Sequence, residues 1–127
     1  MEVGIKAFEE TVVCHENTAA AIGSGALEVF ATPSMIALME KAAMNTVSPF
    51  LEEGQGTVGI KLDVSHLAAS PIGMTVRAEA ELVGIEKRIL TFKVSAYAGD
   101  ELIGEGTHQR AIVLNDRFME KTLAKLK

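Results

Sequence analysis

Apolar residues recur at three- and four-residue spacing in one stretch of the chain, which predicts an amphipathic α-helix. We expect Thr32 to be the N-cap of this helix and Pro33 its first helical residue. The glycines of the segment "EEGQG" after Leu51 end it. The positions on its broad apolar face are Met35, Ile36, Leu38, Met39, Ala42, Ala43, Thr46, Val47 and Phe50.

After Gly56 the period changes to two, which is typical of β-strands. Ile60, Leu62, Val64, His66 and Ala68 alternate with polar residues, so we expect a strand with a histidine on its apolar face. Similar alternation and turn residues predict further strands at 4–13, 74–82, 89–98 and 101–114. The residues 15–25 read as a polar loop, a candidate lid, and those from 116 onward as a short polar helix.

The predicted order is one strand, one long helix and four strands joined by short turns. This order favours an α+β fold in which an antiparallel sheet packs on a single helix. A chain of 127 residues is the size of one domain, so we expect residues 1–127 to form a single domain. One helix cannot cover five strands, and we therefore expect the remaining edge and apolar surface to be buried in a dimer.

Composition and charge exclude several classes of protein. The formal net charge is −5 and the 12 basic residues are scattered, so nucleic acid is not an expected partner. No apolar run approaches the about 20 residues that span a bilayer, and the start "MEVGIKAFEE" lacks the features of a signal peptide. We expect a cytoplasmic protein without a membrane partner. The single cysteine, Cys14, excludes an internal disulfide.

Three residues are candidates for chemistry. Glu40 lies inside or beside the apolar helix face, where it either turns outward to Lys41 and solvent or stays half-buried and holds a proton. His66 is either a core histidine or an imidazole that faces Glu40 across the interface of strand and helix. Thr32 is a cap or a hydroxyl at the helix amino terminus, where backbone N–H groups favour negative charge on a carbonyl oxygen.

The remaining motifs assign neither a metal nor a cofactor. His15, in the first loop, and His108, near Arg110 on the last strand, are further histidines able to face a site. No histidine pair has the i, i+4 spacing of a helical metal site. The chain contains no G-x-S-x-G elbow, no P-loop and no G-x-G-x-x-G motif after a strand.

The predicted order of elements resembles the hotdog fold, a five-stranded antiparallel sheet wrapped around one long central helix. Within that fold the chain resembles the fluoroacetyl-CoA thioesterase family. The matching segments are "EVFAT", "LMEKA", "PFLEEGQGTVG", "VSHLAASPIG" and "GTHQRAIV", which together span most of the chain. The resemblance implies hydrolysis of an acyl-CoA thioester to free acid and CoA.

The resemblance also implies roles for individual residues. It places the catalytic threonine, glutamate and histidine at Thr32, Glu40 and His66, and substrate contacts at Gly59, Arg110 and Phe30. Eight helical residues rise by ~12 Å, too far for Thr32 and Glu40 of one straight helix to reach the same atom. Either Thr32 lies on a bent entry turn or a dimer partner completes each site. Hotdog proteins place their sites at dimer interfaces, so we expect a homodimer or a dimer of dimers.

In the mechanism expected from this resemblance, His66 is a base toward water or the Thr32 hydroxyl and Glu40 orients it or acts on the carbonyl. Helix-end N–H groups hold the oxyanion. Cations that can contact the CoA phosphates are Lys61, Lys87, Arg88 and Arg110.

The segment before "EVFAT" departs from the family. Members specific for fluoroacetyl-CoA carry gate phenylalanines there, whereas this chain has "AIGSGAL", which argues against specificity for a fluorinated acyl group. Leu27 is a candidate to fill part of that gate. Two other functions remain open: a non-catalytic acyl-CoA binding protein, and a hotdog dehydratase acting on a hydroxyacyl thioester.

Overall fold

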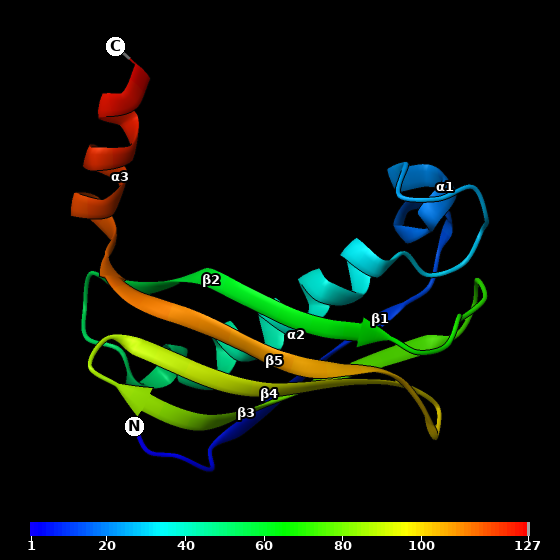
Figure 1. Cartoon of the computed structure of the whole chain (residues 1–127), viewed down its shortest axis with the longest axis horizontal. Coiled ribbons are helices and arrows are strands. Elements are labelled where there is room, and N and C mark those ends of the chain that lie inside the picture. The colour runs from blue at the N-terminus through cyan, green and yellow to red at the C-terminus, as the bar shows by residue number, and fades with distance from the viewer. Residues whose placement is uncertain (127) are drawn as a thin grey trace.

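The structure is a computed structural model that describes residues 1–126. A five-stranded antiparallel sheet in the order β1-β3-β4-β5-β2 wraps around one long helix, α2 (Figure 1). The strands are β1 (Lys6–Val12), β2 (Gln55–His66), β3 (Thr75–Glu86), β4 (Ile89–Ala98) and β5 (Glu101–Leu114). The helices are α1 (Ala19–Ile22), α2 (Thr32–Val47) and α3 (Asn115–Leu123), with short 3-10 turns at His15–Asn17, Ser48–Phe50 and Ala124–Leu126.

Helix α2 supplies one half of the hydrophobic core, as its periodicity predicts. Its start differs from the expectation, because Ala31 is the N-cap and Thr32 is already helical. The backbone N–H of Met35 bonds to the Ala31 carbonyl, and the Thr32 hydroxyl is free to bind elsewhere. The helix ends at Val47 and not at Phe50. Its buried residues are Met35, Leu38, Met39, Ala42, Ala43, Thr46 and Val47.

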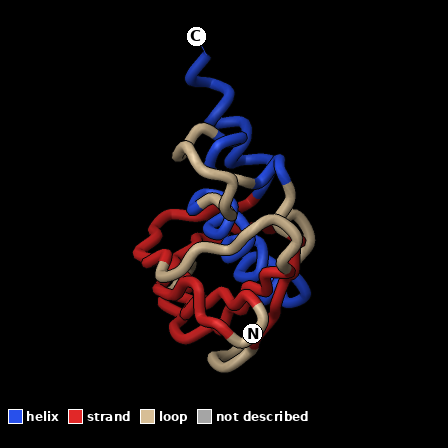
Figure 2. The backbone as a smooth tube through the Cα atoms, turned by 90° about the vertical axis from the view of Figure 1, so that its right-hand side faces the viewer, coloured by secondary structure: helices blue, strands red, loops and turns tan. Residues whose placement is uncertain are grey.

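Strands β3 and β4 supply the other half of the core. Their alternation is confirmed, since every second residue lies against the helix side while the residues between them face the other side of the sheet. Figure 2 shows the strands curving around the central helix. The buried residues are Val76, Ala78, Ala80, Leu82, Leu90, Phe92, Val94 and Ala96.

Strand β2 is an edge strand, and here the predicted burial is wrong. The register with β5 shifts between Gly59 and Lys61, and this irregularity breaks the simple alternation. Helix α2 packs mainly on β1 and β3, so β2 is left largely uncovered. As a result Ile60 is 50% exposed and Leu62 38% exposed.

Both peripheral helices lie on the β2 side of the sheet, at opposite ends (Figure 1). The segment 15–25 that was expected to be a loop contains a 3-10 turn and α1, whose N-cap Thr18 accepts a hydrogen bond from the Ala21 N–H. Helix α3 starts one residue earlier than predicted. None of the helices within residues 1–126 has the length and hydropathy needed to cross a membrane.

Candidate active site

The Thr32 hydroxyl and the His66 imidazole form a hydrogen-bonded pair. Thr32 opens α2 and His66 ends β2, and packing brings Oγ1 to 2.7 Å from Nδ1. Burial lowers the pKa of His66 from 6.5, an effect that the backbone of Ala68 partly offsets. The imidazole is therefore neutral at pH 7 and able to accept a proton. Its Nε2 atom is buried and has no hydrogen-bond partner among the described residues.

A cavity of about 310 Å³ lies beside this pair. Phe30, which is 1% exposed, and Val29 come from the segment before α2, and Leu67 follows His66. The other walls are small side chains, from Ala19, Ser24, Ala68 and Ala69. Phe30 thus lines the same cavity as the Thr32–His66 pair, and the cavity has room for a small group beside them.

Glu40 belongs to a second cluster, on the inner side of β2 and β5. Its Oε2 lies 3.6 Å from Nη1 of Arg110, whose side chain is 8% exposed. A Cβ atom placed on Gly59 would lie only 2.7 Å from the same oxygen. Lys41 pairs instead with Glu9, at 3.5 Å. Glu40 therefore faces the sheet, and the alternative in which it turns outward to Lys41 is wrong.

His108 completes this cluster; the sequence offered it as a histidine able to face a site but did not assign it a role there. Its Nδ1 lies 2.8 Å from the Lys61 carbonyl, which only accepts, so Nδ1 carries the proton. Nε2 then accepts a hydrogen bond from Arg110 Nη1 at 3.1 Å. Burial is the main cause that lowers the pKa of His108, and Arg110 adds to it, while the Lys61 carbonyl and Glu40 oppose it. A neutral His108 thus positions the guanidinium.

Thr57 holds the other side of Arg110. Nε of Arg110 donates to Thr57 Oγ1 at 2.8 Å, and Nη2 donates to the Thr57 carbonyl at 3.0 Å. With His108 also bound, the guanidinium is fixed at the point where it meets Glu40. The two-residue spacing of His108 and Arg110 on one strand, which places both on the same face, was the available signal for this arrangement.

The two clusters do not meet within one chain. No hydrogen bond or ion pair in the described part of the chain joins Glu40 to Thr32 or His66. Thr32 is the first residue of one continuous helix, so a bent entry turn does not bring it to Glu40. Among the cations expected near CoA phosphates, Arg110 is buried, whereas Lys61, Lys87 and Arg88 are exposed. No three His, Cys, Asp or Glu residues in the range 1–126 are grouped to hold a metal ion.

A sheet wrapped around one helix, with a threonine–histidine pair at the helix start and a carboxylate further along, defines a hotdog-fold thioesterase. Comparison with known families supports this class: residues 13–116 match the model of the fluoroacetyl-CoA-specific thioesterases. The chain belongs to this family and is thus a thioester hydrolase.

Individual relatives agree with this assignment. The chain is 45% identical over 98 residues to the fluoroacetyl-CoA thioesterase of Streptantibioticus cattleyicolor, covering 77% of this chain and 70% of the relative. A crystal structure of a fluoroacetyl-CoA-specific thioesterase variant in complex with fluoroacetate and CoA has a TM-score of 0.88 and 40% identity, covering 93% of this chain and 99% of that one. A thioesterase superfamily member from Thermus thermophilus has a TM-score of 0.89 and 33% identity, covering 98% and 92%.

Proposed function

We propose that the chain hydrolyses an acyl-CoA thioester, and that each site combines Thr32 and His66 of one protomer with Glu40 of the partner subunit. The observation that carries this proposal is the 2.7 Å contact between Thr32 Oγ1 and His66 Nδ1. This distance is within the range required of a nucleophile and its base. The lowered pKa of His66 keeps the base neutral near pH 7.

In the proposed reaction His66 takes the proton of the Thr32 hydroxyl as Oγ1 attacks the thioester carbonyl. The C–S bond then breaks, CoA leaves as the thiol with the proton held by His66, and an acyl ester remains on Thr32. Water, deprotonated by His66, then attacks this ester; the bond between the acyl carbon and Thr32 Oγ1 breaks, His66 returns the proton to Oγ1, and the free acid is released. Thr32 is at the amino terminus of α2, whose free N–H groups and dipole favour the negative charge that develops on the carbonyl oxygen.

We propose that the partner subunit pairs through β2. This strand is an uncovered edge, and the exposed apolar side chains of Ile60 and Leu62 lie on it. Two identical strands that pair antiparallel about a two-fold axis bring the Gln55 end of one beside the His66 end of the other. That arrangement moves the partner subunit's Glu40 toward the Thr32–His66 pair, which a single protomer does not do.

We propose a small acyl group as the substrate, without specificity for fluoroacetyl. Alanine and serine contribute four of the nine residues that line the cavity beside His66, and the segment "AIGSGAL" contains no phenylalanine. Gly59, Arg110 and Phe30 keep supporting roles in this proposal: Gly59 leaves room for the Glu40 carboxylate, Arg110 pairs with it and Phe30 walls the acyl cavity. The proposed location is the cytoplasm.

The test is release of free CoA from a panel of short, medium and aryl acyl-CoAs. We expect Thr32→Ala, His66→Ala and Glu40→Gln each to lower kcat/KM by about 100-fold or more while the melting temperature stays within a few degrees. Thr32→Ser is the matched control and should retain activity, because it keeps the hydroxyl. Mass spectrometry of quenched enzyme should show the acyl group on Thr32. If rapidly quenched samples lack this group, His66 activates water for direct attack on the thioester, and Thr32 is not the nucleophile.

Two outcomes would contradict the proposal. No turnover with any thioester, combined with protection against heat by acyl-CoA, would make the protein a binding protein. Conversion of a hydroxyacyl-CoA to an unsaturated thioester without CoA release would make it a dehydratase.

A further inference from the structure

We propose that a cavity beneath α3, named here the α3 cavity, binds the 3′-phosphoadenosine diphosphate part of CoA and presents the thioester to the partner subunit's active site. The α3 cavity has a volume of about 370 Å³, which is in the range of ligand pockets. It lies between the β3–β4 turn, the end of β5 and α3. Its lining residues are Arg88, Val113, Leu114, Arg117, Phe118 and Lys121. This inference rests on the proposed function.

The charge of the α3 cavity fits a phosphate ligand. Arg88, Arg117 and Lys121 line it, and no Asp or Glu side chain of residues 1–126 does. None of the three forms an ion pair within the described part of the chain, although the whole protein carries a net charge of −5. Arg117 and Lys121 are four residues apart in α3 and therefore share one helix face. Three cations that line one cavity and have no counter-ion among the described residues are a site for the phosphates of a nucleotide.

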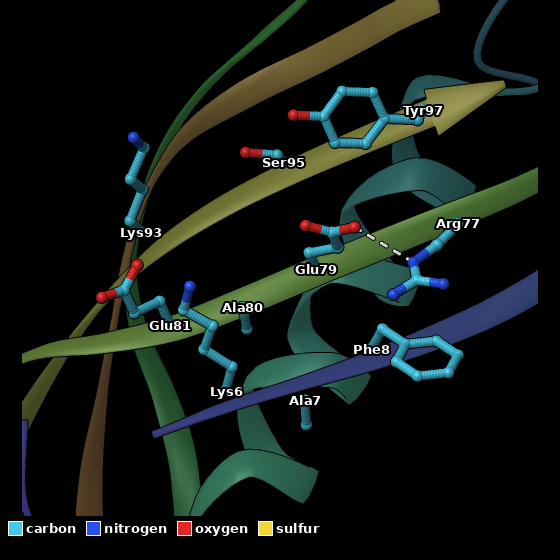
Figure 3. Close-up of a pocket in the computed structure, with 10 residues that line it drawn as sticks. All are labelled: Lys6, Ala7, Phe8, Arg77, Glu79, Ala80, Glu81, Lys93, Ser95 and Tyr97. Carbon is cyan, nitrogen blue, oxygen red and sulfur yellow. Dashed lines mark hydrogen bonds and ion pairs between the residues drawn. The ribbon is translucent and has the colours of Figure 1, made fainter. Parts of the chain in front are cut away.

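A second cavity shows what a neutralised cluster looks like in the same molecule (Figure 3). It lies on the outer face of the sheet and is lined by three cations but also by Glu79 and Glu81. Arg77 there donates to Glu79 at 3.0 Å and its guanidinium lies 3.8 Å from the centre of the Phe8 ring. Carboxylates thus balance the charge of the outer-face cavity, and Arg77 pairs with one of them, whereas none of the described residues that line the α3 cavity is a carboxylate.

The apolar lining of the α3 cavity fits the adenine base. Phe118 is 39% exposed and Leu114 51% exposed, in a part of the molecule where no other element of the chain covers them. An exposed phenylalanine beside cations is a stacking surface for a nucleobase whose phosphates the cations hold. Together the residues match both halves of a phosphoadenosine ligand.

The distance along the sheet assigns the α3 cavity to the partner's active site. Val113 and Leu114 pair with Gly56 and Gln55, at the start of β2, whereas His66 ends that strand about 33 Å away. The pantetheine arm of CoA is about as long as five extended residues, roughly 18 Å, and does not span this. With β2 edges paired antiparallel, α3 of one protomer lies near α1 and the Thr32–His66 pair of the other. Both helices already extend past the β2 edge (Figure 1).

The first test compares an acyl-CoA with the same acyl group on pantetheine, which lacks the nucleotide. We expect Arg117→Gln combined with Lys121→Gln to raise KM for acyl-CoA about tenfold and to leave KM for acyl-pantetheine unchanged. The control removes two charges from the outer-face cavity, Lys6→Gln with Lys93→Gln, and should change neither value. Equal effects on both thioesters, or none on acyl-CoA, would overturn the inference while leaving the proposed hydrolysis intact.

Calorimetric titration with CoA itself tests the α3 cavity independently of turnover. The double variant at Arg117 and Lys121 should bind CoA about tenfold more weakly than the unmodified protein, and added salt should narrow that difference. Equal affinity of the two proteins would refute the site even if no thioester is hydrolysed.

Mixed dimers test whether the cavity acts across the interface. In a mixed dimer, one protomer carries His66→Ala and the other carries the double substitution at Arg117 and Lys121. If each site combines His66 of one protomer with the α3 cavity of the other, one of the two sites keeps both intact. Mixing the two inactive or weakened proteins should therefore restore low-KM hydrolysis of acyl-CoA. If dimers shown to be mixed do not regain low-KM hydrolysis, the α3 cavity does not serve the partner subunit's active site, and the inference is refuted.

Discussion

Replacing Gly59 with alanine displaces the Glu40 carboxylate without removing any charge around it. The new Cβ would lie 2.7 Å from Glu40 Oε2 and 3.3 Å from His108 Cε1. To reach an ordinary separation of 3.4 Å, the carboxylate must retreat by about 0.7 Å. In the catalytic role that we propose for Glu40, a displacement of this size lowers the rate by about 10- to 100-fold. We therefore expect kcat/KM for acyl-CoA to fall by that factor.

Stability should change little in the same variant. Gly59 does not have a positive φ, so alanine fits its backbone and reduces the entropy of the unfolded chain, which offsets part of the local crowding. The net change in unfolding free energy is about 1 kcal/mol or less, a shift of about 4 °C in Tm at most. Gly84→Ala is the matched control, because its Cβ would meet Thr91 at an ordinary 3.5 Å. An unchanged kcat/KM in Gly59→Ala, or an equal loss in Gly84→Ala, would refute a catalytic role for the Glu40 position.

Three further predictions concern pH, assembly and the buried cation. Burial lowers the pKa of His66 and His108 below 6.5, so near that pH the folded protein binds fewer protons than the unfolded chain. The free energy of unfolding should therefore be highest above about pH 7.5 and decrease as the pH falls through 6.5. Thermal melts from pH 8 to 5.5 should show this decrease, and His108→Gln should make it shallower. Leu62→Glu should yield monomers by light scattering together with loss of hydrolysis, since the partner subunit's Glu40 would be absent; an active monomer would contradict the shared site. Arg110→Met should lower the free energy of unfolding by about 2 kcal/mol in denaturant titrations, less than for a fully buried pair because Glu40 is 36% exposed. A fully stable Arg110→Met variant would show that Glu40 needs no counter-ion.

Local periodicity was sufficient to predict the elements of this fold. Helix α2 and strands β3 and β4 bury most of their periodic apolar residues as predicted, because all three elements flank one core. The prediction is wrong for Phe50 and Met74, which lie outside these elements and are 49% and 36% exposed. The residue at the helix start was predicted less well. Threonine is a residue type favoured at N-caps, but the hydroxyl of Thr32 binds His66, which lies 34 residues away in the chain.

Strand β2 shows where pattern reasoning fails. Ile60 and Leu62 have the alternation of a buried strand, yet a register irregularity and the path of α2 leave them exposed in the single chain. Their pattern records a surface that we propose is covered by a second copy, and sequence periodicity does not distinguish a partner from the chain's own core.

By itself, the sequence determined the order of the elements and the residues of β3 and β4 that face the core, and it offered Thr32, Glu40 and His66 as candidates for chemistry. Only the tertiary structure decided which of them meet. It paired Thr32 with His66 and separated both from Glu40, which it placed against Arg110 and Gly59. The physical reason is that helix and strand patterns depend on neighbours within a few residues, whereas contacts between functional groups depend on how α2 crosses the curved sheet.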